Sequence, residues 1–359
     1  MKAIKKGFIL PSAAYVLKRS QIRSFGPLDR KPEVGDVAYG MIVRVGQHSS
    51  LENASGRIHR VQDGSRSVFV FGNRYAPDFY EGFVPGQAER ELDLLSQSGL
   101  IGVARTKNSM IKDPTRVQLD GYVCDEEGKV MNTRDWPLVN PKRQIAKEPR
   151  ARMILVCGTS MNSGKSLAAA ACCWVLSSAG CNVRAAKITG TASLKDILHM
   201  NDAGAAHYAD FSYLGYPSTY LLPEEELLRI FRQLDLKYAN NPRNFWVVEV
   251  ADGIAQRETA LLLRAPEVRR RIHRLILCAN DAFGALGGLT TLRDEFDLVP
   301  DALSGLCSSS PLHVRELQIF TSIPIFNSAQ PDADVLRRIL VPLRTRRRPV
   351  PPVRATAEP

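Results

Sequence analysis

The chain lacks any uninterrupted apolar run of about 18 residues, the length that a membrane-spanning helix needs. It also lacks a typical signal peptide. The lysines near the start are followed by the short apolar stretch FIL, but Pro11, Lys18 and Arg19 interrupt it and no small-residue cleavage site follows. We therefore expect a cytoplasmic protein with no membrane partner.

Metal-binding cysteine and histidine patterns are absent as well. The seven cysteines form no CxxC pair and have no zinc spacing, and the six histidines form no HxxxH pair. Most cysteines sit in apolar runs such as MILVCG and LILCAN, where a reduced cysteine behaves as a small hydrophobic residue. The pattern predicts buried, reduced cysteines and argues against a structural zinc site.

Positive charge is in excess but is unevenly spread. The net charge is +11, and much of the excess lies in RRRIHR (269–274) and RTRRRPVPPVR (344–354). Such runs can contact nucleic acid or anionic lipid, and the alternative is a solvated helix face followed by a disordered tail. We favour the second interpretation, expect no nucleic-acid partner, and predict that the Pro/Arg-rich tail 344–359 is disordered.

The chain divides into two regions of different pattern. After an N-terminal segment (1–30), residues 31–140 contain short β-branched and aromatic runs broken by Gly, Asp, Asn and Pro, which predicts a small β barrel or sandwich. Within it we expect one helix at 86–99 and a hairpin at 115–132. A polar linker (141–150) precedes residues 151–343, where apolar strands alternate with helical patterns. The predicted class is therefore α/β, with a mostly parallel sheet preceded by a smaller β-rich domain.

A phosphate-binding loop is predicted between the first strand and the first helix of the second region. The strand MILVC runs into GTSMNSGKS, whose small residues let backbone N–H groups surround a phosphate at a helix N-terminus. Lys165 would reach the β- and γ-phosphates and Ser166 would hold Mg²⁺. Five residues separate Gly158 from Gly164, one more than in the usual pattern. The predicted nucleotide-binding residues are Gly158, Thr159, Asn162, Ser163, Gly164, Lys165, Ser166 and Leu167.

A loop of the form GTxxxxGK[ST] resembles dethiobiotin synthetase and the wider SIMIBI group of P-loop proteins, which includes cobyrinate amidases and the ParA/MinD class. Further elements follow in the same order: Lys187 ends a strand in NVRAAKITGTAS, HMNDAGA offers Asp202, WVVEVADGI offers Glu249, and ILCANDAFGALGGLTTLRD begins a Gly-rich helix. The resemblance implies catalytic roles for Lys165, Lys187 and Glu249, and Mg²⁺ ligation by Ser166, Asp202 and Glu249. Its implied cofactors are ATP and Mg²⁺.

Each carried-over role has a structural alternative. Lys187 could be a strand-end lysine that extends to solvent, and Asp202 could cap a helix. The sequence also departs from the family. Ser160 and Met161 stand where the loop of the family usually has Asp and Thr, so the resemblance leaves the acceptor open. Ser160 also occupies the place of the ParA-type lysine, which argues against a partitioning ATPase.

The function predicted from these features is Mg²⁺-dependent ATP binding and hydrolysis, with an ATP-dependent ligase or synthetase acting on a small acceptor as the first hypothesis. The alternatives are a nucleotide-dependent switch that acts through the β domain or a partner in a homodimer, and an ATPase coupled to nucleic acid. No NKxD guanine-reading signature is present, which favours ATP over GTP. Three polar, aromatic segments are candidate ligand walls or interfaces: 72–82, 207–222 and 252–259.

Overall fold

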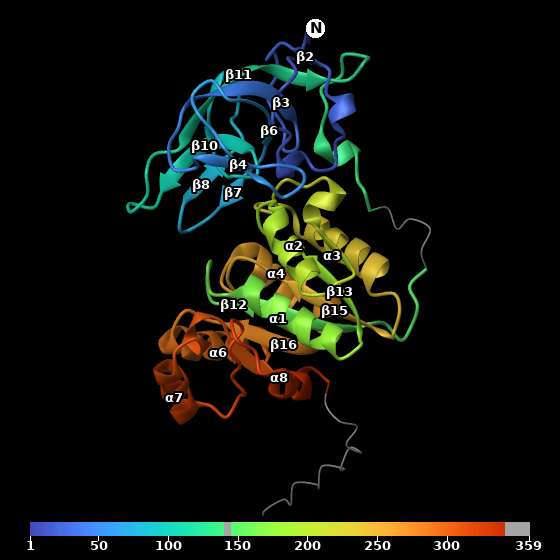
Figure 1. The fold of residues 1–359 in the computed structure, drawn as a ribbon, viewed down its shortest axis with the longest axis vertical. Coiled ribbons are helices and arrows are strands. Elements are labelled where there is room, and N and C mark those ends of the chain that lie inside the picture. Colours follow the sequence, from blue (N-terminus) through green and yellow to red (C-terminus); the bar gives the residue numbers. More distant parts are fainter. Residues whose placement is uncertain (140–144, 342–359) are drawn as a thin grey trace, which may run out of the picture.

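The structure, a computed structural model, describes residues 1–139 and 145–341 and has two regions stacked end to end (Figure 1). The strand-rich region, blue to teal in the figure, precedes the helix-rich region, green to red. Among the described helices, none is both long and apolar enough to cross a membrane. The tail 344–359, part of the expected linker (141–144) and the last residue of the expected β-rich domain (140) lie outside the described residues.

The first region consists mainly of strands: β1 (Lys2–Ala3), β2 (Ser24–Gly26), β3 (Val37–Arg44), β4 (Ser50–Glu52), β5 (Ile58–Arg60), β6 (Arg66–Phe71), β7 (Arg74–Tyr75), β8 (Tyr80–Phe83), β9 (Glu91–Leu94), β10 (Leu100–Lys107) and β11 (Thr115–Cys124). Short 3₁₀ turns lie at Ser12–Ala14, Arg19–Gln21 and Thr133–Asp135. β1 and β2, which fall in the expected N-terminal segment, pair in series onto β11 and so belong to the same sheet.

Five of these strands close into a barrel. β11 pairs with β3, β3 with β6, β6 with β10, β10 with β9, and β9 returns to β11. Their inward side chains form one apolar cluster that includes Ile42, Phe69, Leu92, Ile101 and Leu119, each at most 1% exposed. A closed ring leaves no unpaired edge among its members, so the barrel is a rigid support for the loops at its ends.

The helix expected at 86–99 is wrong, because β9 occupies the middle of that range. Leu92 and Leu94 are fully buried, and β9 pairs with both β10 and β11. Barrel closure therefore outweighs the helix-forming tendency of the local sequence. The hairpin expected at 115–132 is confirmed, since β11 turns at Asp125 and Cys124 bridges back to Val130.

The second region contains a parallel sheet whose strand order is β14-β13-β15-β12-β16-β17. Its strands are β12 (Arg152–Gly158), β13 (Asn182–Lys187), β14 (His207–Asp210), β15 (Asn244–Glu249), β16 (Ile272–Cys278) and β17 (Ala302–Ser304). Its helices are α1 (Lys165–Ser178), α2 (Leu194–Asp202), α3 (Glu224–Tyr238), α4 (Arg257–Arg264), α5 (Pro266–Arg269), α6 (Ala282–Phe296), α7 (Pro311–Phe320) and α8 (Ala333–Leu340). Short 3₁₀ turns lie at Phe211–Leu214 and Leu306–Ser308.

Alternate residues of each strand pack on opposite faces of this sheet. Ile154 and Val156 of β12 join a cluster with α1, α2 and α8, whereas Met153 and Leu155 join a cluster with α3, α4 and α6. The strands are apolar on both faces because helices cover both faces. The cysteines agree with this arrangement: Cys181 is half-buried and the other cysteines are buried and unpaired.

The two regions meet around the start of α2. Glu52 of β4 is 2% exposed, and its carboxylate accepts hydrogen bonds of 2.9 Å from the backbone N–H groups of Leu194 and Lys195. A buried carboxylate at a helix N-terminus satisfies orphan donors and complements the helix dipole. Ser12 also donates to Glu52, so this side chain ties three segments together.

Glu52→Ala should lower the free energy of unfolding by about 2–4 kcal/mol, because it leaves two buried N–H groups without an acceptor. Urea denaturation followed by circular dichroism measures the change. Glu127→Ala, at an exposed turn of the same region, is the matched control and should change stability by less than about 0.5 kcal/mol. Equal effects of the two substitutions would show that Glu52 does not hold the regions together.

Candidate nucleotide-binding site

The phosphate loop runs from the end of β12 at Gly158 to the start of α1 at Lys165. The loop is packed too closely for side chains at its glycines. A Cβ on Gly158 would lie 2.2 Å from the Ser163 hydroxyl. Gly164 adopts φ +92°, and a Cβ there would lie 2.8 Å from the Cα of Gly305, which follows β17. Both glycines are therefore required by the shape of the loop.

Neighbouring strands hold the loop in place. Thr159 N–H donates to the Cys278 carbonyl at 2.9 Å, and Ile254 N–H donates to the Gly158 carbonyl at 2.8 Å. The Lys165 ammonium folds over the loop and donates to the Ser160 carbonyl at 2.7 Å. Backbone N–H groups of residues 160–164 donate to no acceptor in the described part of the chain. Such free N–H groups at a helix N-terminus are suited to bind an anion.

Two carboxylates lie beside the Ser166 hydroxyl. Its oxygen is 3.1 Å from Glu249 Oε1, at the end of β15, and 3.4 Å from Asp196 Oδ1, in the first turn of α2. Glu249 is 1% exposed, and its second oxygen, Oε2, is buried without a hydrogen-bond partner. Burial raises the pKa of the Glu249 carboxyl above its usual value.

Lys187, at the end of β13, joins these carboxylates. Its ammonium contacts Asp196 Oδ2 and lies 3.9 Å from Glu249 Oε1. Burial alone would lower the pKa of Lys187, but the two carboxylates outweigh burial and raise it above its usual value. Burial would raise the pKa of Asp196, but Lys187 outweighs burial and lowers it. Lys187 is therefore a buried cation held by two acids.

Asp196, Glu249 and Ser166 fit a magnesium ion. Mg²⁺ binds through one or two carboxylates and completes its octahedron with water and phosphate oxygens. The unpartnered Oε2 of Glu249 is a free acceptor of the required type. No group of three or more His, Cys, Asp or Glu side chains in the described ranges is arranged as a metal site, so the phosphates would have to supply part of the coordination.

The structure places most of the residues predicted from the sequence in one cavity of about 410 Å³ over the loop. Its lining includes Asn162, Gly164, Lys165, Ser166, Leu167, Lys187 and Glu249. Gly158, Thr159 and Ser163 shape the loop behind them. Asn162 also donates to Asp78 of the barrel region. Segment 72–82, one of the three candidate walls, therefore contacts the phosphate loop through Asp78.

Asp202 is not brought into this group. It is the last residue of α2 and lines a separate pocket with Leu167 and Trp174. Asp196, six positions earlier, is the residue that contacts Ser166. Because each helical residue turns about 100°, residues six apart lie on different faces. Sequence reasoning missed Asp196, although an acid in the first turn after the Lys187 strand was an available signal.

The other segments singled out from the sequence have mixed outcomes. In 252–259, Asp252 lines the cavity, whereas Gln256 caps α4 and Glu258 accepts from Leu221 N–H. Segment 207–222 lies against the barrel region: Tyr220 donates to Glu81, and Tyr213 packs on Tyr15 at 5.0 Å between ring centroids. Of the basic run 269–274, Arg269, Arg271 and Arg274 form ion pairs with Asp297, Asp235 and Asp301.

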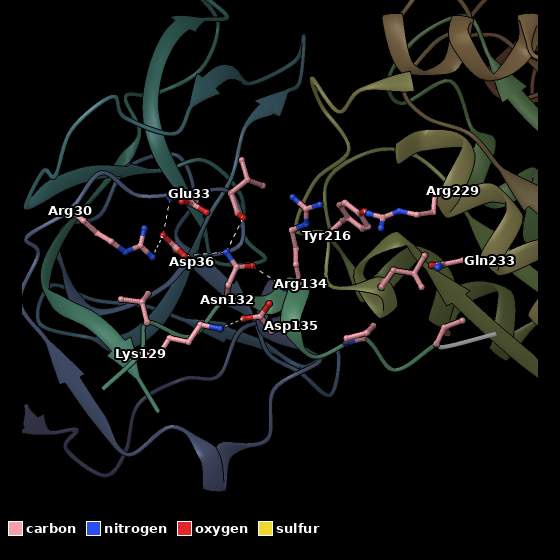
Figure 2. A pocket seen from close by; sticks show the side chains of 15 residues that line it. Arg30, Glu33, Asp36, Lys129, Asn132, Arg134, Asp135, Tyr216, Arg229 and Gln233 are labelled. Atoms are coloured by element: carbon pink, nitrogen blue, oxygen red, sulfur yellow. Dashed lines mark hydrogen bonds and ion pairs between the residues drawn. The ribbon is translucent and has the colours of Figure 1, made fainter. Parts of the chain in front are cut away.

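A larger cavity, of about 730 Å³, lies between the two regions and away from the phosphate loop (Figure 2). Its charged side chains are largely paired with one another. Arg30 contacts Asp36 at 2.8 Å, and Lys129 contacts Asp135 at 3.3 Å. Arg134 is paired with Glu226 at 2.8 Å. Arg30, Lys129 and Arg134 of this lining are therefore each paired with a carboxylate.

Comparisons with known proteins find distant similarity only. No protein-family model and no curated protein matches the chain. Similar solved structures include the signal recognition particle receptor FtsY from Elizabethkingia anophelis in complex with GDP, at 10% identity and a TM-score of 0.34, covering 55% of this chain and 66% of that one. A second structure of that receptor has 12% identity and a TM-score of 0.34, and the match covers 54% of this chain and 67% of that one. Chloroplast FtsY from Physcomitrella patens has 13% identity and a TM-score of 0.34, and the match covers 57% of this chain and 70% of that one.

Similarity at this level assigns neither a nucleotide nor a partner to the chain. None of these three structures is a dethiobiotin synthetase, so that narrower resemblance rests on the sequence motifs alone. The geometry of the site itself carries the coarser conclusion. A parallel sheet, a loop whose glycines leave no room for side chains, and the lysine and serine at the start of α1 together have the geometry of a phosphate-binding loop at a helix N-terminus.

Asp196→Asn should raise the Mg²⁺ concentration needed for half-maximal nucleotide binding by about tenfold or more, because it removes a charged oxygen beside Ser166. Asp202→Asn is the matched control, since it makes the same change on the same helix, and should shift this concentration less than twofold. Titration of a fluorescent ATP analogue against Mg²⁺ measures both. A larger effect of Asp202→Asn than of Asp196→Asn would support Asp202, the Mg²⁺ ligand expected from the sequence, and reject Asp196.

Proposed function

We propose that the chain binds ATP with Mg²⁺ at the phosphate loop and uses it to activate a small acceptor, as an ATP-dependent ligase or synthetase does. One observation carries this proposal. The cavity over the loop adjoins a second cavity of about 400 Å³, and Lys187, Asp196 and Asp252 line both. A γ-phosphate at the loop would therefore face this second cavity between the two regions, which has room for a second substrate.

Different residues over the loop would contact the phosphates and the Mg²⁺ ion. Backbone N–H groups of residues 160–164 and the Lys165 ammonium bind the phosphates, after Lys165 releases the Ser160 carbonyl. Ser166, Asp196 and Glu249 would hold Mg²⁺, which would supply charge neutralisation for the phosphates. Lys187, kept cationic by its two acids, faces the side on which the γ-phosphate would end.

The chemistry is an in-line transfer of the γ-phosphoryl group. An oxygen of the acceptor, or of water in its absence, forms a bond to the γ-phosphorus. The bond from that phosphorus to the β–γ bridging oxygen breaks, and the nucleoside diphosphate leaves. Asp252 is positioned to take a proton from the attacking group, and burial raises the pKa of its carboxyl, which makes it a better base. Lys165 and Lys187 offset the charge that develops.

Adenine is proposed as the base because the chain has no NKxD signature for guanine. Calorimetric titration with non-hydrolysable ATP and GTP analogues in Mg²⁺ should give tighter binding of the ATP analogue. Lys165→Ala should lower the affinity for it at least tenfold, because a charged contact to the phosphates is lost. Tighter binding of GTP would reject the base assignment alone. No binding of either nucleotide would reject the P-loop proposal.

Asp252→Asn should lower the rate of ATP cleavage about 100-fold, because the amide keeps the shape of the side chain but cannot accept a proton. Affinity for the ATP analogue should change less than threefold, since Asp252 is not proposed to hold the phosphates. Phosphate release and calorimetry measure the two quantities. An unchanged rate would remove Asp252 from the proposed chemistry and leave the nucleotide site intact.

A nucleotide-dependent switch is the second candidate, and one contact favours it. Glu52 of β4, in the strand-rich region, holds the N-terminus of α2, and α2 carries Asp196 at the proposed Mg²⁺ site. Nucleotide binding that moved α2 would therefore change how the barrel is held. Amide hydrogen exchange with and without Mg²⁺ and the ATP analogue separates the two candidates. A switch requires altered protection in the barrel strands β3 and β6, which line neither cavity, whereas the enzyme proposal confines the change to the loop and the cavity linings.

A homodimer stays a prediction from the sequence, and it bears on the switch. A partner protomer is one of the two elements through which a switch could act. Analytical ultracentrifugation with and without the ATP analogue measures the oligomeric state directly. A monomer in both conditions would limit the switch proposal to the barrel.

A further inference from the structure

Arg74 of β7 is an unmatched buried cation. It is 6% exposed, yet it forms no ion pair with a carboxylate among residues 1–139 and 145–341. Its Nη1 lies 3.0 Å from His48 Nε2, and its Nε is buried without any hydrogen-bond partner. Its guanidinium carbon lies 5.2 Å from the centroid of the Phe79 ring. A buried charge without a partner is costly to the folded protein.

His48 does not relieve this imbalance. It is 4% exposed, and burial together with the Arg74 charge lowers its pKa to about 3, so the imidazole is neutral at physiological pH. Its ring packs near Phe79 at 5.3 Å and near Tyr80 at 5.8 Å, which fixes its orientation. Burial lowers the pKa of Arg74 to about 10, and Asp252 opposes this shift from a longer distance. Arg74 therefore stays charged.

The unmatched guanidinium lines the second cavity, the one that adjoins the phosphate site. The side of this cavity formed by the strand-rich region includes Gln47, His48, Glu52, Arg74, Ser96 and Gln97, and the Glu52 carboxylate is already bonded to the start of α2. The other side supplies Lys187, Lys195, Asp196 and Asp252. A molecule in the cavity would thus have Arg74 at the barrel wall and Lys187 at the wall shared with the nucleotide. A volume of about 400 Å³ lies in the range of small-molecule sites.

We propose that this cavity binds a small carboxylic acid, whose carboxylate pairs with the Arg74 guanidinium while its opposite end points toward Lys187 and the γ-phosphate. The planar fork of an arginine matches a carboxylate better than a point charge does. The amides of Gln47 and Gln97 and the Ser96 hydroxyl supply neutral donors and acceptors for the rest of the molecule. This inference rests on the proposed function, because it names the class of acceptor.

Because Arg74 has no ion-pair partner in the described part of the chain, its removal should not destabilise the protein. Replacing it with an apolar side chain of similar length removes a desolvation cost and no ion pair. Arg74→Met should therefore leave the melting temperature of the free protein equal to or above that of the wild type, as expected for a residue kept for ligand binding. A fall of more than about 5 °C would show that Arg74 is needed for the fold and would overturn the proposal.

Ligand binding is tested on the full chain with Mg²⁺ and the non-hydrolysable ATP analogue. The probes are succinate, adipate and citrate, with inorganic phosphate as a second anion and succinamide as an uncharged control. At least one carboxylate should raise the melting temperature of the wild type, and Arg74→Met should lower its affinity at least tenfold. Arg105→Met, an exposed arginine of the same region, should behave as the wild type.

Three outcomes would overturn the assignment: no carboxylate stabilises the wild type, carboxylates stabilise Arg74→Met equally, or only phosphate acts through Arg74. Calorimetry with the ATP analogue alone, on the wild type, keeps this result separate from the proposed function. Nucleotide binding without carboxylate binding would reject only the acceptor class. Loss of nucleotide binding would reject the proposed function itself.

Discussion

The buried ion cluster of Lys187, Asp196 and Glu249 is the interaction on which the rest of the site depends. It joins the ends of two strands to the first turn of α2 and reaches Ser166 at the start of α1. A buried ammonium flanked by acids is stable only while the whole group stays together, because each member left alone would be a desolvated charge. The cluster therefore sets the positions of four elements relative to the phosphate loop.

The strand-rich region is connected to this cluster indirectly, through α2. Glu52 satisfies the N-terminus of α2, and that helix presents Asp196 two positions after its first residue. The strand-rich region therefore fixes a helix that belongs to the nucleotide site. It contributes Arg74 and His48 to the adjoining cavity as well. Both candidate functions depend on this arrangement, one through the cavity and the other through the helix.

The parts of the site that could be predicted from the sequence are those written in short, contiguous patterns. Gly158, Lys165 and Ser166 follow from one strand–loop–helix segment, and Glu249 follows from an acid at the end of an apolar strand. Asp196 was missed because a motif supplies spacing along the chain but not the helical face that an acid occupies. The position of Asp202 illustrates that difference, since it ends the same helix on another side.

Long-range pairing accounts for what could not be predicted elsewhere. Strand β9 has helix-forming residues, but two neighbouring strands distant in sequence determine its conformation. In the sequence, Arg74 looks like an ordinary arginine in a turn. The fold buries it against His48, and it has no acidic partner in the described part of the chain. The contact of Gly164 with Gly305 has a consequence for biosynthesis. The packing of the phosphate loop against Gly305 can be completed only after residue 305 has left the ribosome.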